Sequence, residues 1–423
     1  MSQPPAASRD RDEPAAAAGT AAAATPPPAF ALLPDLAARL LGGSVMWAND
    51  EFFADKENLI RSEPPMFTPG DFTHKGQRYD GWETRRRRPS DRGEHDSAII
   101  RLGAPGVLRG IVVDTAFFLG NYPPRCSIEA TCYEGYPGPT ELQRAGWVTV
   151  VPPHALHGGA VHYLPIRGLD RRFTHVRLNM LPDGGIARLR VHGEPVADPA
   201  FLAGLTADLA ALRDGARITA CSDAFYGRPD NLLMPGRPHT MGEGWENARR
   251  RGAGNDWVEI ALIAEGRPRV LELDTTHFKG NAPYKVRVRG ARLIRETAAP
   301  RDQAPGTRVP AAIPAGRNGT ASVGTSMSTG TTSAAQAAGQ SAHWFELLPP
   351  TRLQPDTEHR FLLPPPPADS TAPTHRSADS ATAPVTHLRI DVYPDGGMAR
   401  VRVLGPLTPA GLETLTHRWN ETR

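Results

Sequence analysis

The chain repeats its own sequence, and this duplication constrains the fold more than any single motif. Three segments of the first half return in the second half in the same order: residues 80–88 as 243–251, residues 112–121 as 272–281, and residues 173–178 as 385–390. Two tandem copies of one domain are the natural interpretation. The recurring residues include carboxylates, arginines and an asparagine beside glycine, which an apolar core alone does not require.

The composition limits the functional classes. A chain of 423 residues has room for about three domains of ~100–200 residues each, and the repeat reduces that to two, each long enough to bury its own core. The net charge of +3 is too small to indicate nucleic-acid binding, and no apolar run approaches the ~18 residues of a membrane span. The three cysteines, Cys126, Cys132 and Cys221, have no metal or redox spacing. We therefore expect a cytoplasmic protein without nucleic-acid or membrane partners.

Short alternating apolar runs, broken by Gly, Pro, Asn and Asp, predict an all-β fold for the first copy. About seven strands in one domain indicate an antiparallel sandwich or jelly roll. The predicted strands are Ser97–Arg101, Leu108–Asp114, Arg125–Tyr133, Trp147–Val151, Gly159–Leu164, Thr174–Met180 and Ile186–Val191. The clearest hairpin turns at Pro182–Gly185, and Pro394–Gly397 repeats it in the second copy.

Helices and linkers set the domain boundaries. Asp198 and Pro199 open a predicted helix, and Thr408 and Pro409 open another at the end of the chain. Segments poor in large apolar residues cannot offset chain entropy, so we expect a disordered tail and two disordered inserts. The predicted order is tail 1–38, sandwich repeat 39–197, helix 198–215, sandwich repeat 216–407 with inserts 298–342 and 364–384, and helix 408–423.

The first candidate site is the segment around Trp82. Asp80 and Glu83 flank the indole, and Arg85 and Arg86 follow. A guanidinium suits a carboxylate ligand, and a carboxyl near an indole can have its pKa raised enough to move protons. The other interpretation is a solvated basic loop pinned by one buried tryptophan. The second copy keeps the equivalents Glu246, Arg249 and Arg250, but Ala248 replaces Arg85.

The second candidate site links a strand end to a Gly-Asn turn. A buried run delivers Asp114 to the end of a strand, and Asn121 follows seven residues later; Asp274 and Asn281 repeat the arrangement. Strand ends that lead into loops are where such folds place ligand groups. A plain turn, in which Asp and Asn bond local backbone, is the alternative.

Metal and cofactor signals are weak. His154 and His157 lie three residues apart, but no third ligand follows at metal spacing. There is no nucleotide-binding glycine loop and no nucleophile elbow. We expect no cofactor, and a divalent metal stays open.

Several of these segments together resemble the allantoicases. The resemblance rests on Trp47–Ala54, Glu57–Ile60, Tyr79–Arg86, and Asp114–Thr115 with Gly120–Tyr122, and it covers both copies from about Gly42 to Leu407. The Gly-Trp-Glu-Thr-Arg-Arg run with the downstream Asp-Thr and Gly-Asn pairs is specific to that family. One departure is Ser97, where the second copy has Trp257.

The resemblance implies two galactose-binding-like sandwiches, a homo-oligomer, and hydrolysis of allantoate, a small ureide, to ureidoglycolate and urea. The predicted catalytic residues are Glu83, Asp80, Asp114, Glu246 and Asp274, and the predicted substrate-binding residues are Arg85, Arg86, Asn121, Arg249, Arg250 and Asn281. A non-catalytic ligand-binding sandwich is the main alternative, because such folds often only bind. A third possibility makes one copy catalytic and the other structural.

Overall fold

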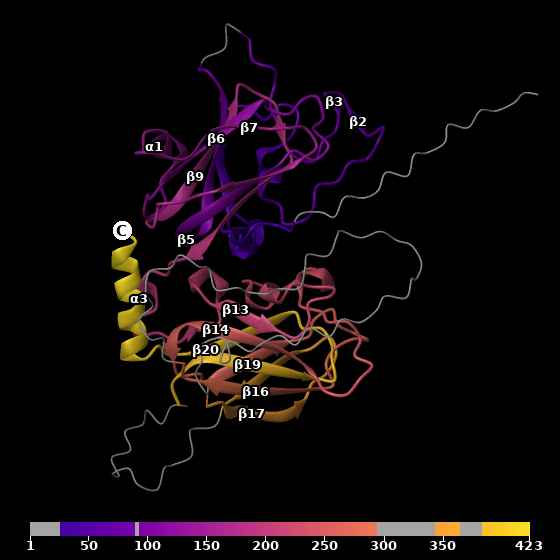
Figure 1. Ribbon diagram of the computed structural model, residues 1–423, viewed down its shortest axis with the longest axis vertical. Helices are drawn as coiled ribbons and strands as arrows, with labels where there is room; N and C mark the ends of the chain where they lie inside the picture. Colours follow the sequence, from indigo (N-terminus) through magenta and orange to yellow (C-terminus); the bar gives the residue numbers. More distant parts are fainter. Residues whose placement is uncertain (1–25, 89–92, 294–342, 364–382) are drawn as a thin grey trace, which may run out of the picture.

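The computed structural model describes residues 26–88, 93–293, 343–363 and 383–423. Most of its elements are β-strands, arranged as two repeats that lie one above the other in Figure 1. This confirms the predicted all-β, two-repeat fold. The predicted disordered segments 1–25, 298–342 and 364–382 lie outside the described residues.

Repeat 1 is organised around one long strand, β5 (Asp96–Asp114), which serves both layers of the sandwich. Its first half pairs with β1 and β9, and its second half pairs with β8 and β11. The two strands predicted in this region are therefore one. The other strands are β1 (Ser44–Ala48), β2 (Phe72–Thr73), β3 (Gly76–Gln77), β4 (Trp82–Glu83), β6 (Arg125–Thr131), β7 (Val148–Ala155), β8 (Val161–Pro165), β9 (Arg172–Leu181), β10 (Gly185–Ile186) and β11 (Arg188–Pro195).

Repeat 2 divides the same path into two sheets, ordered β13-β14-β19-β16-β17 and β12-β20-β15-β18. Pro268 stands where repeat 1 has Leu108, and a proline has no N–H for the ladder, so β14 ends before it. The strands are β12 (Ala207–Asp208), β13 (Arg217–Cys221), β14 (Asp256–Gly266), β15 (Val270–Asp274), β16 (Lys285–Ala291), β17 (Phe345–Arg352), β18 (Glu358–Leu362), β19 (Val385–Tyr393) and β20 (Arg400–Gly405).

The core of each repeat lies between its layers. Val176, Leu178 and Met180 of β9 are fully buried, and their counterparts in β19 are buried as well. Each such side chain contributes about 1.5–3 kcal/mol of transfer free energy. Trp82 and Trp245 are also fully buried, and the indole N–H of each donates to a backbone carbonyl at 2.8 Å. The repeated tryptophan therefore anchors the loop that precedes each candidate site.

In both repeats an indole ring packs on the strand arginine, but the tryptophan comes from a different segment in each. Trp257 packs on the Arg389 guanidinium at 4.0 Å from the ring centroid. Repeat 1 has Ser97 instead, and there Trp147, from a neighbouring segment, packs on Arg177 at 4.7 Å. The departure at Ser97 thus leaves the strand arginine covered by an indole.

The predicted helix over residues 198–215 is wrong. Asp198 caps only a short 3-10 turn, η4 (Pro199–Phe201), and a second turn, η5 (Leu212–Asp214), follows β12. Gly204 has φ +71°, which ends the helical path. The buried Leu209 then donates its N–H to the Val403 carbonyl at 2.7 Å. Leu209 therefore packs on repeat 2 from an extended segment, whereas Phe201 and Leu205 are exposed.

The predicted disorder is also wrong for residues 26–38. This segment forms η1 (Ala29–Leu32) and leads into η2 (Arg39–Leu41), and Leu36 is fully buried. A Cβ at Gly110 would lie 2.3 Å from the Phe30 ring, so that glycine leaves room for the segment to pack. The segment is rich in alanine and proline, which predicted disorder, but a few of its apolar residues cover repeat 1.

The predicted final helix is confirmed as α3 (Pro409–Glu421), and the Thr408 hydroxyl accepts the Gly411 N–H at 3.0 Å. It begins in repeat 2 and runs along both repeats in Figure 1. Arg172 of repeat 1 lies 3.5 Å from the Trp419 ring centroid. The short elements that remain are η3 (Lys56–Ile60), α1 (Pro139–Gln143), η6 (Pro229–Leu233) and η7 (Met241–Glu243). No helix within the described ranges is long and apolar enough to cross a membrane.

Candidate active site

The structure brings Glu83 and Asn121 together. Glu83 lies on the short strand β4, opposite Gly185 of β10, and the Asn121 side-chain amide donates to its carboxyl at 2.7 Å. Burial raises the pKa of the Glu83 carboxyl, although the hydrogen bond from Asn121 acts against that rise. A carboxyl with a raised pKa keeps its proton to higher pH than an exposed one, which suits a proton donor.

The repeated Pro-Asp-Gly-Gly turn fixes the position of Asn121. Gly185 N–H donates to the Asn121 carbonyl at 2.7 Å, and Gly184 has φ +142°. A Cβ at Gly184 would lie 2.8 Å from the Asn121 carbonyl oxygen, so a larger residue would push the loop away. The sequence predicted the turn but not this contact.

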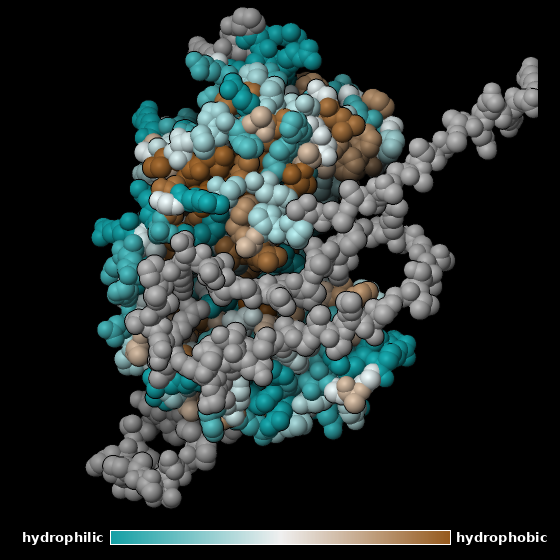
Figure 2. All heavy atoms as spheres, viewed as in Figure 1, coloured by the Kyte–Doolittle hydropathy of each residue, from teal (hydrophilic) through white to brown (hydrophobic). Residues whose placement is uncertain are grey.

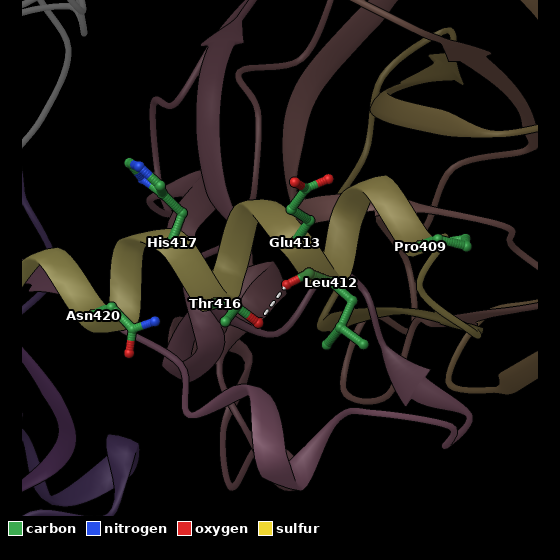
Figure 3. Close-up of a pocket in the computed structure, with 6 residues that line it drawn as sticks. All are labelled: Pro409, Leu412, Glu413, Thr416, His417 and Asn420. Carbon is green, nitrogen blue, oxygen red and sulfur yellow. Dashed lines mark hydrogen bonds between the residues drawn. The ribbon is translucent and has the colours of Figure 1, made fainter.

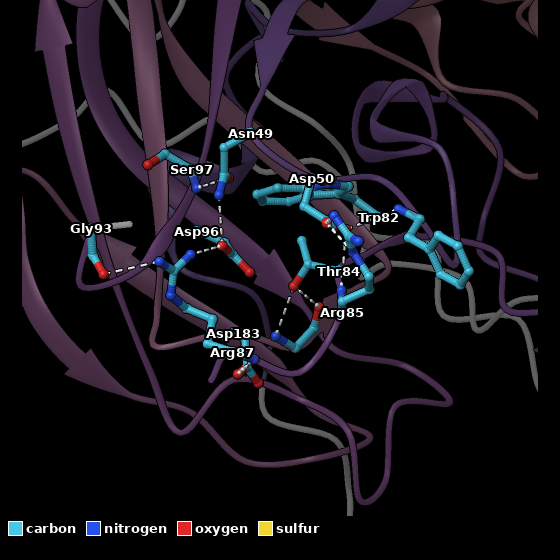
Figure 4. A network of polar contacts seen from close by, with 12 residues as sticks. Asn49, Asp50, Trp82, Thr84, Arg85, Arg87, Gly93, Asp96, Ser97 and Asp183 are labelled. Atoms are coloured by element: carbon cyan, nitrogen blue, oxygen red, sulfur yellow. Dashed lines mark hydrogen bonds and ion pairs between the residues drawn. The ribbon is translucent and has the colours of Figure 1, made fainter. Parts of the chain in front are cut away.

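Arg85 is held at the surface by Asp50, a residue that the sequence interpretation did not single out. The Arg85 guanidinium lies 2.6 Å from the Asp50 carboxylate, which also accepts the backbone N–H of Arg85 (Figure 4). Burial acts to raise the pKa of the Asp50 carboxyl, but hydrogen bonds from Phe52 and Arg85 outweigh it and hold that pKa below its usual value. The Arg85 side chain is 67% exposed, so one face stays open to an anion. Asp50 lay within a segment that resembles the family.

The arginine run divides between surface and interior. Arg86 is exposed, whereas Arg87 turns inward to an ion pair of 2.5 Å with Asp96 (Figure 4). Asp96 is 2% exposed and also accepts from Asn49 at 2.7 Å. Asp183 of the turn accepts the Arg87 backbone N–H at 2.6 Å. Arg87 therefore ties the site loop to the sheet.

Asp80 and Asp114 lie on either side of Arg188. Asp80 pairs with the buried Arg188 guanidinium at 2.7 Å, and burial, which would raise its pKa, is outweighed by this pairing, so the pKa is lowered. Asp114 lies opposite Arg188 in the ladder and accepts the Ala116 N–H at 2.8 Å; burial raises its pKa. Neither carboxylate hydrogen-bonds to Glu83 among the described residues. Their predicted catalytic role stays a prediction.

Repeat 2 reproduces most of this geometry. The Asn281 amide donates to the Glu246 carboxyl at 2.6 Å, and Asp274 accepts the Thr276 N–H at 2.7 Å. Arg249 is exposed, and Arg250 is ion-paired with the buried Asp256. The predicted substrate contacts of these two arginines stay predictions.

One surface charge is missing from repeat 2. Asp223 accepts the backbone N–H of Ala248 at 2.5 Å, as Asp50 does from Arg85 in repeat 1. With alanine at this position, repeat 2 has no guanidinium at the place that Arg85 occupies. The carboxylate scaffold is therefore conserved between the repeats, but the exposed cation is not.

Two other features lie apart from these sites. A hollow of about 500 Å³ runs along α3, lined by Pro409, Leu412, Glu413, Thr416, His417 and Asn420 (Figure 3). None of the predicted site residues lines it, so it does not account for them. In the part of the chain that the structure describes, no group of three His, Cys, Asp or Glu side chains could hold a metal ion. The His157 N–H donates instead to the His162 ring at 2.9 Å.

Comparison with known proteins finds the same duplication. A model of the allantoicase repeat matches residues 34–196 and again residues 207–408. The chain belongs to the allantoicase family. Membership of the allantoicase family makes it an enzyme of the hydrolase class.

Relatives of this allantoicase-family chain match it over most of its length. A probable allantoicase of Nocardia farcinica is 47% identical over 381 residues, which cover 89% of this chain and 95% of that protein. One of Streptomyces avermitilis is 41% identical and covers 93% and 90%. The crystal structure of the Saccharomyces cerevisiae allantoicase is similar with a TM-score of 0.63 at 32% identity, covering 88% of this chain and 92% of that one.

Proposed function

We propose that this chain hydrolyses allantoate to ureidoglycolate and urea, and that the reaction takes place beside Glu83. The observation that carries the proposal is the Glu83–Asn121 pair, in which burial raises the pKa of the carboxyl. Arg85, two residues further along, presents an exposed cation that the substrate carboxylate can bind. The names of the relatives support the choice of allantoate.

The proposed reaction breaks an aminal C–N bond. Allantoate carries a carboxylate and two ureido arms on one carbon. A base takes the proton from the nitrogen of the arm that stays, and an acid gives a proton to the nitrogen of the arm that leaves as urea. The remaining acyl-imine then adds water at its carbon to give ureidoglycolate. The scheme as written needs no cofactor.

The described residues suit distinct parts of this scheme. Glu83, with its raised pKa, is protonated more readily than an exposed carboxyl and donates to the leaving nitrogen. The side-chain N–H of Asn121 orients Glu83. The side-chain oxygen of Asn121 then accepts a hydrogen bond from a ureido N–H. Arg85 and Arg86 bind the substrate carboxylate. Asp114 or Asp80 takes the second proton, with Asp80 kept ionised by Arg188.

The test is urea release from allantoate by the purified full-length chain and by Glu83→Gln. Glutamine keeps an oxygen that accepts from Asn121 but carries no acidic proton. We expect kcat to fall by about 10²–10⁴-fold, the usual contribution of general acid–base catalysis. Wild-type turnover in the variant would remove Glu83 from the mechanism. Absence of urea release by the wild-type chain would instead favour a ligand-binding protein.

A further inference from the structure

A loop beside the proposed site is longer in repeat 1 than in repeat 2. Each of these loops is held by its own buried arginine. Arg188 donates to the carbonyls of Glu63 and Asp80, and Arg400 donates to those of Gly236 and Glu243. Between these fixed ends repeat 2 has only a few residues, whereas repeat 1 inserts the hairpin β2–β3. The insertion is therefore a feature of repeat 1 alone.

Aromatic contacts hold this insertion against the loop that carries Asn121. The Phe67 ring lies 5.5 Å from that of Tyr79 and 5.6 Å from that of Phe117, and Tyr79 stacks on Phe118 at 5.1 Å. Phe117 and Phe118 precede Asn121 in the same loop. Figure 2 shows apolar residues exposed on repeat 1 near the place of β2 and β3 in Figure 1. The hairpin thus has a fixed relation to the proposed site.

The tip of the hairpin places a lysine over Phe52, the ring that Arg85 also contacts. The Thr73 hydroxyl accepts the Lys75 N–H at 3.1 Å and donates to the Gly76 carbonyl at 3.3 Å, which closes the turn. The Lys75 ammonium lies 5.0 Å from the centroid of the Phe52 ring, and the Arg85 guanidinium lies 5.5 Å from the same centroid. Two cations therefore share one exposed ring.

The chain positions of these groups place them at the proposed site. The N–H of Phe53, next to Phe52, donates to the backbone carbonyl of Glu83 at 3.2 Å. Asp50 pairs with Arg85, but Lys75 has no carboxylate partner among the residues that the structure describes. A lysine over an exposed phenylalanine is held weakly and can turn to an anion. The local charge therefore favours an anion beside Glu83.

We propose that Lys75 is a further cation of the repeat 1 site, binding the substrate carboxylate together with Arg85 and Arg86, and that the β2–β3 hairpin confines this binding to repeat 1. The inference rests on the proposed function, since it takes the ligand to be a small carboxylate. Repeat 2 has no counterpart of Lys75 or Arg85 in this role. Ala248 stands in place of Arg85, and Arg237 in the short loop pairs with Glu358 at 3.3 Å.

The experiment compares KM and kcat for allantoate in the wild-type chain, Lys75→Gln and Lys75→Arg. Losing one charge contact of the substrate carboxylate should raise KM about tenfold in Lys75→Gln and leave kcat within about twofold. Lys75→Arg should stay within about threefold of wild-type KM because the charge is kept. Added NaCl should raise KM less in Lys75→Gln than in the wild type, because less charge attraction is left to screen.

Arg101→Gln is the matched control, because Arg101 also lies over an exposed aromatic ring of repeat 1, that of Tyr136 at 5.0 Å. Its KM should equal that of the wild type. An unchanged KM in Lys75→Gln, or an equal rise in Arg101→Gln, would overturn the inference while urea release by the wild type still upheld the proposed function. Absence of urea release by the wild type would remove the proposed function itself.

Discussion

The two repeats share a scaffold and differ in what surrounds it. Each presents a glutamate that accepts from an asparagine, at 2.7 Å in repeat 1 and 2.6 Å in repeat 2. Each holds its site loop by an arginine paired with a buried aspartate. Only repeat 1 adds an exposed guanidinium at Arg85 and the β2–β3 hairpin. Matching cores therefore do not imply matching chemistry, because the charges that meet a ligand lie outside the core.

The arginines that follow the repeated tryptophan have two different roles. Arg87 and Arg250 turn inward and stabilise the loops, whereas Arg85 turns outward and has no cationic counterpart in repeat 2. A structural arginine should matter in both repeats, and a substrate arginine should matter in one.

The largest effect on stability should come from Arg87→Ala. It leaves Asp96, which is 2% exposed, without its cation, and breaking a buried ion pair on one side costs about 3–5 kcal/mol. Guanidinium unfolding would measure this loss. Arg250→Ala should cost a similar amount, because it strands Asp256, whose side chain is also 2% exposed. A rise in KM without any loss of stability in Arg250→Ala would instead support its predicted contact with substrate.

Arg85→Ala should raise KM for allantoate by about ten- to a hundredfold, since hydrogen bonds to charged groups contribute about 1.5–3 kcal/mol. Steady-state kinetics would measure it, with Arg249→Ala as the repeat 2 control and little expected change there. The reciprocal variant Ala248→Arg, placed beside Asp223, would sharpen the test. Equal rises in KM for Arg85→Ala and Arg249→Ala would contradict the asymmetry.

Asn121→Ala should shift the pH profile of kcat. The Asn121 hydrogen bond lowers the pKa of Glu83, so its loss should raise that pKa further. An acid works in its protonated form, and kcat is lost as the pH rises through the folded pKa. The alkaline limb should therefore move to higher pH in Asn121→Ala, together with a lower maximum, and stay in place in Asn281→Ala. A limb that moves to lower pH would exclude Glu83 as the acid.

The sequence predicted what local chemistry decides. Alternation of apolar and polar residues predicted the strands, Pro182–Gly185 predicted the turn, and Thr408 with Pro409 predicted the last helix. Local sequence patterns failed where contacts with residues distant in the sequence determine the structure. Asp198 and Pro199 predicted a helix over residues 198–215, but the contact of Leu209 with repeat 2 holds that segment in an extended form. Side-chain pairs across the fold cannot be read from spacing, and neither Asp50 as the partner of Arg85 nor Lys75 beside Phe52 was predicted.

The repeat itself supplied the information that spacing could not. Glu83 and Asn121 are far apart in the sequence, yet both recur as Glu246 and Asn281, and both pairs form hydrogen bonds. Asp80 and Asp114 also have recurring counterparts. Asp80 pairs with Arg188, which pins a loop, and Asp114 lies opposite Arg188 in the ladder, so recurrence alone does not separate a structural role from the proposed proton transfer.

Paired turnover measurements of Glu83→Gln and Glu246→Gln are the most direct test of whether the reaction takes place in repeat 1. Both substitutions remove one carboxyl and keep an acceptor for the neighbouring asparagine. We predict that urea release from allantoate falls by about 10²-fold or more in Glu83→Gln and by less than about threefold in Glu246→Gln. Equal losses in the two variants, or a larger loss in Glu246→Gln, would contradict the assignment of the chemistry to repeat 1.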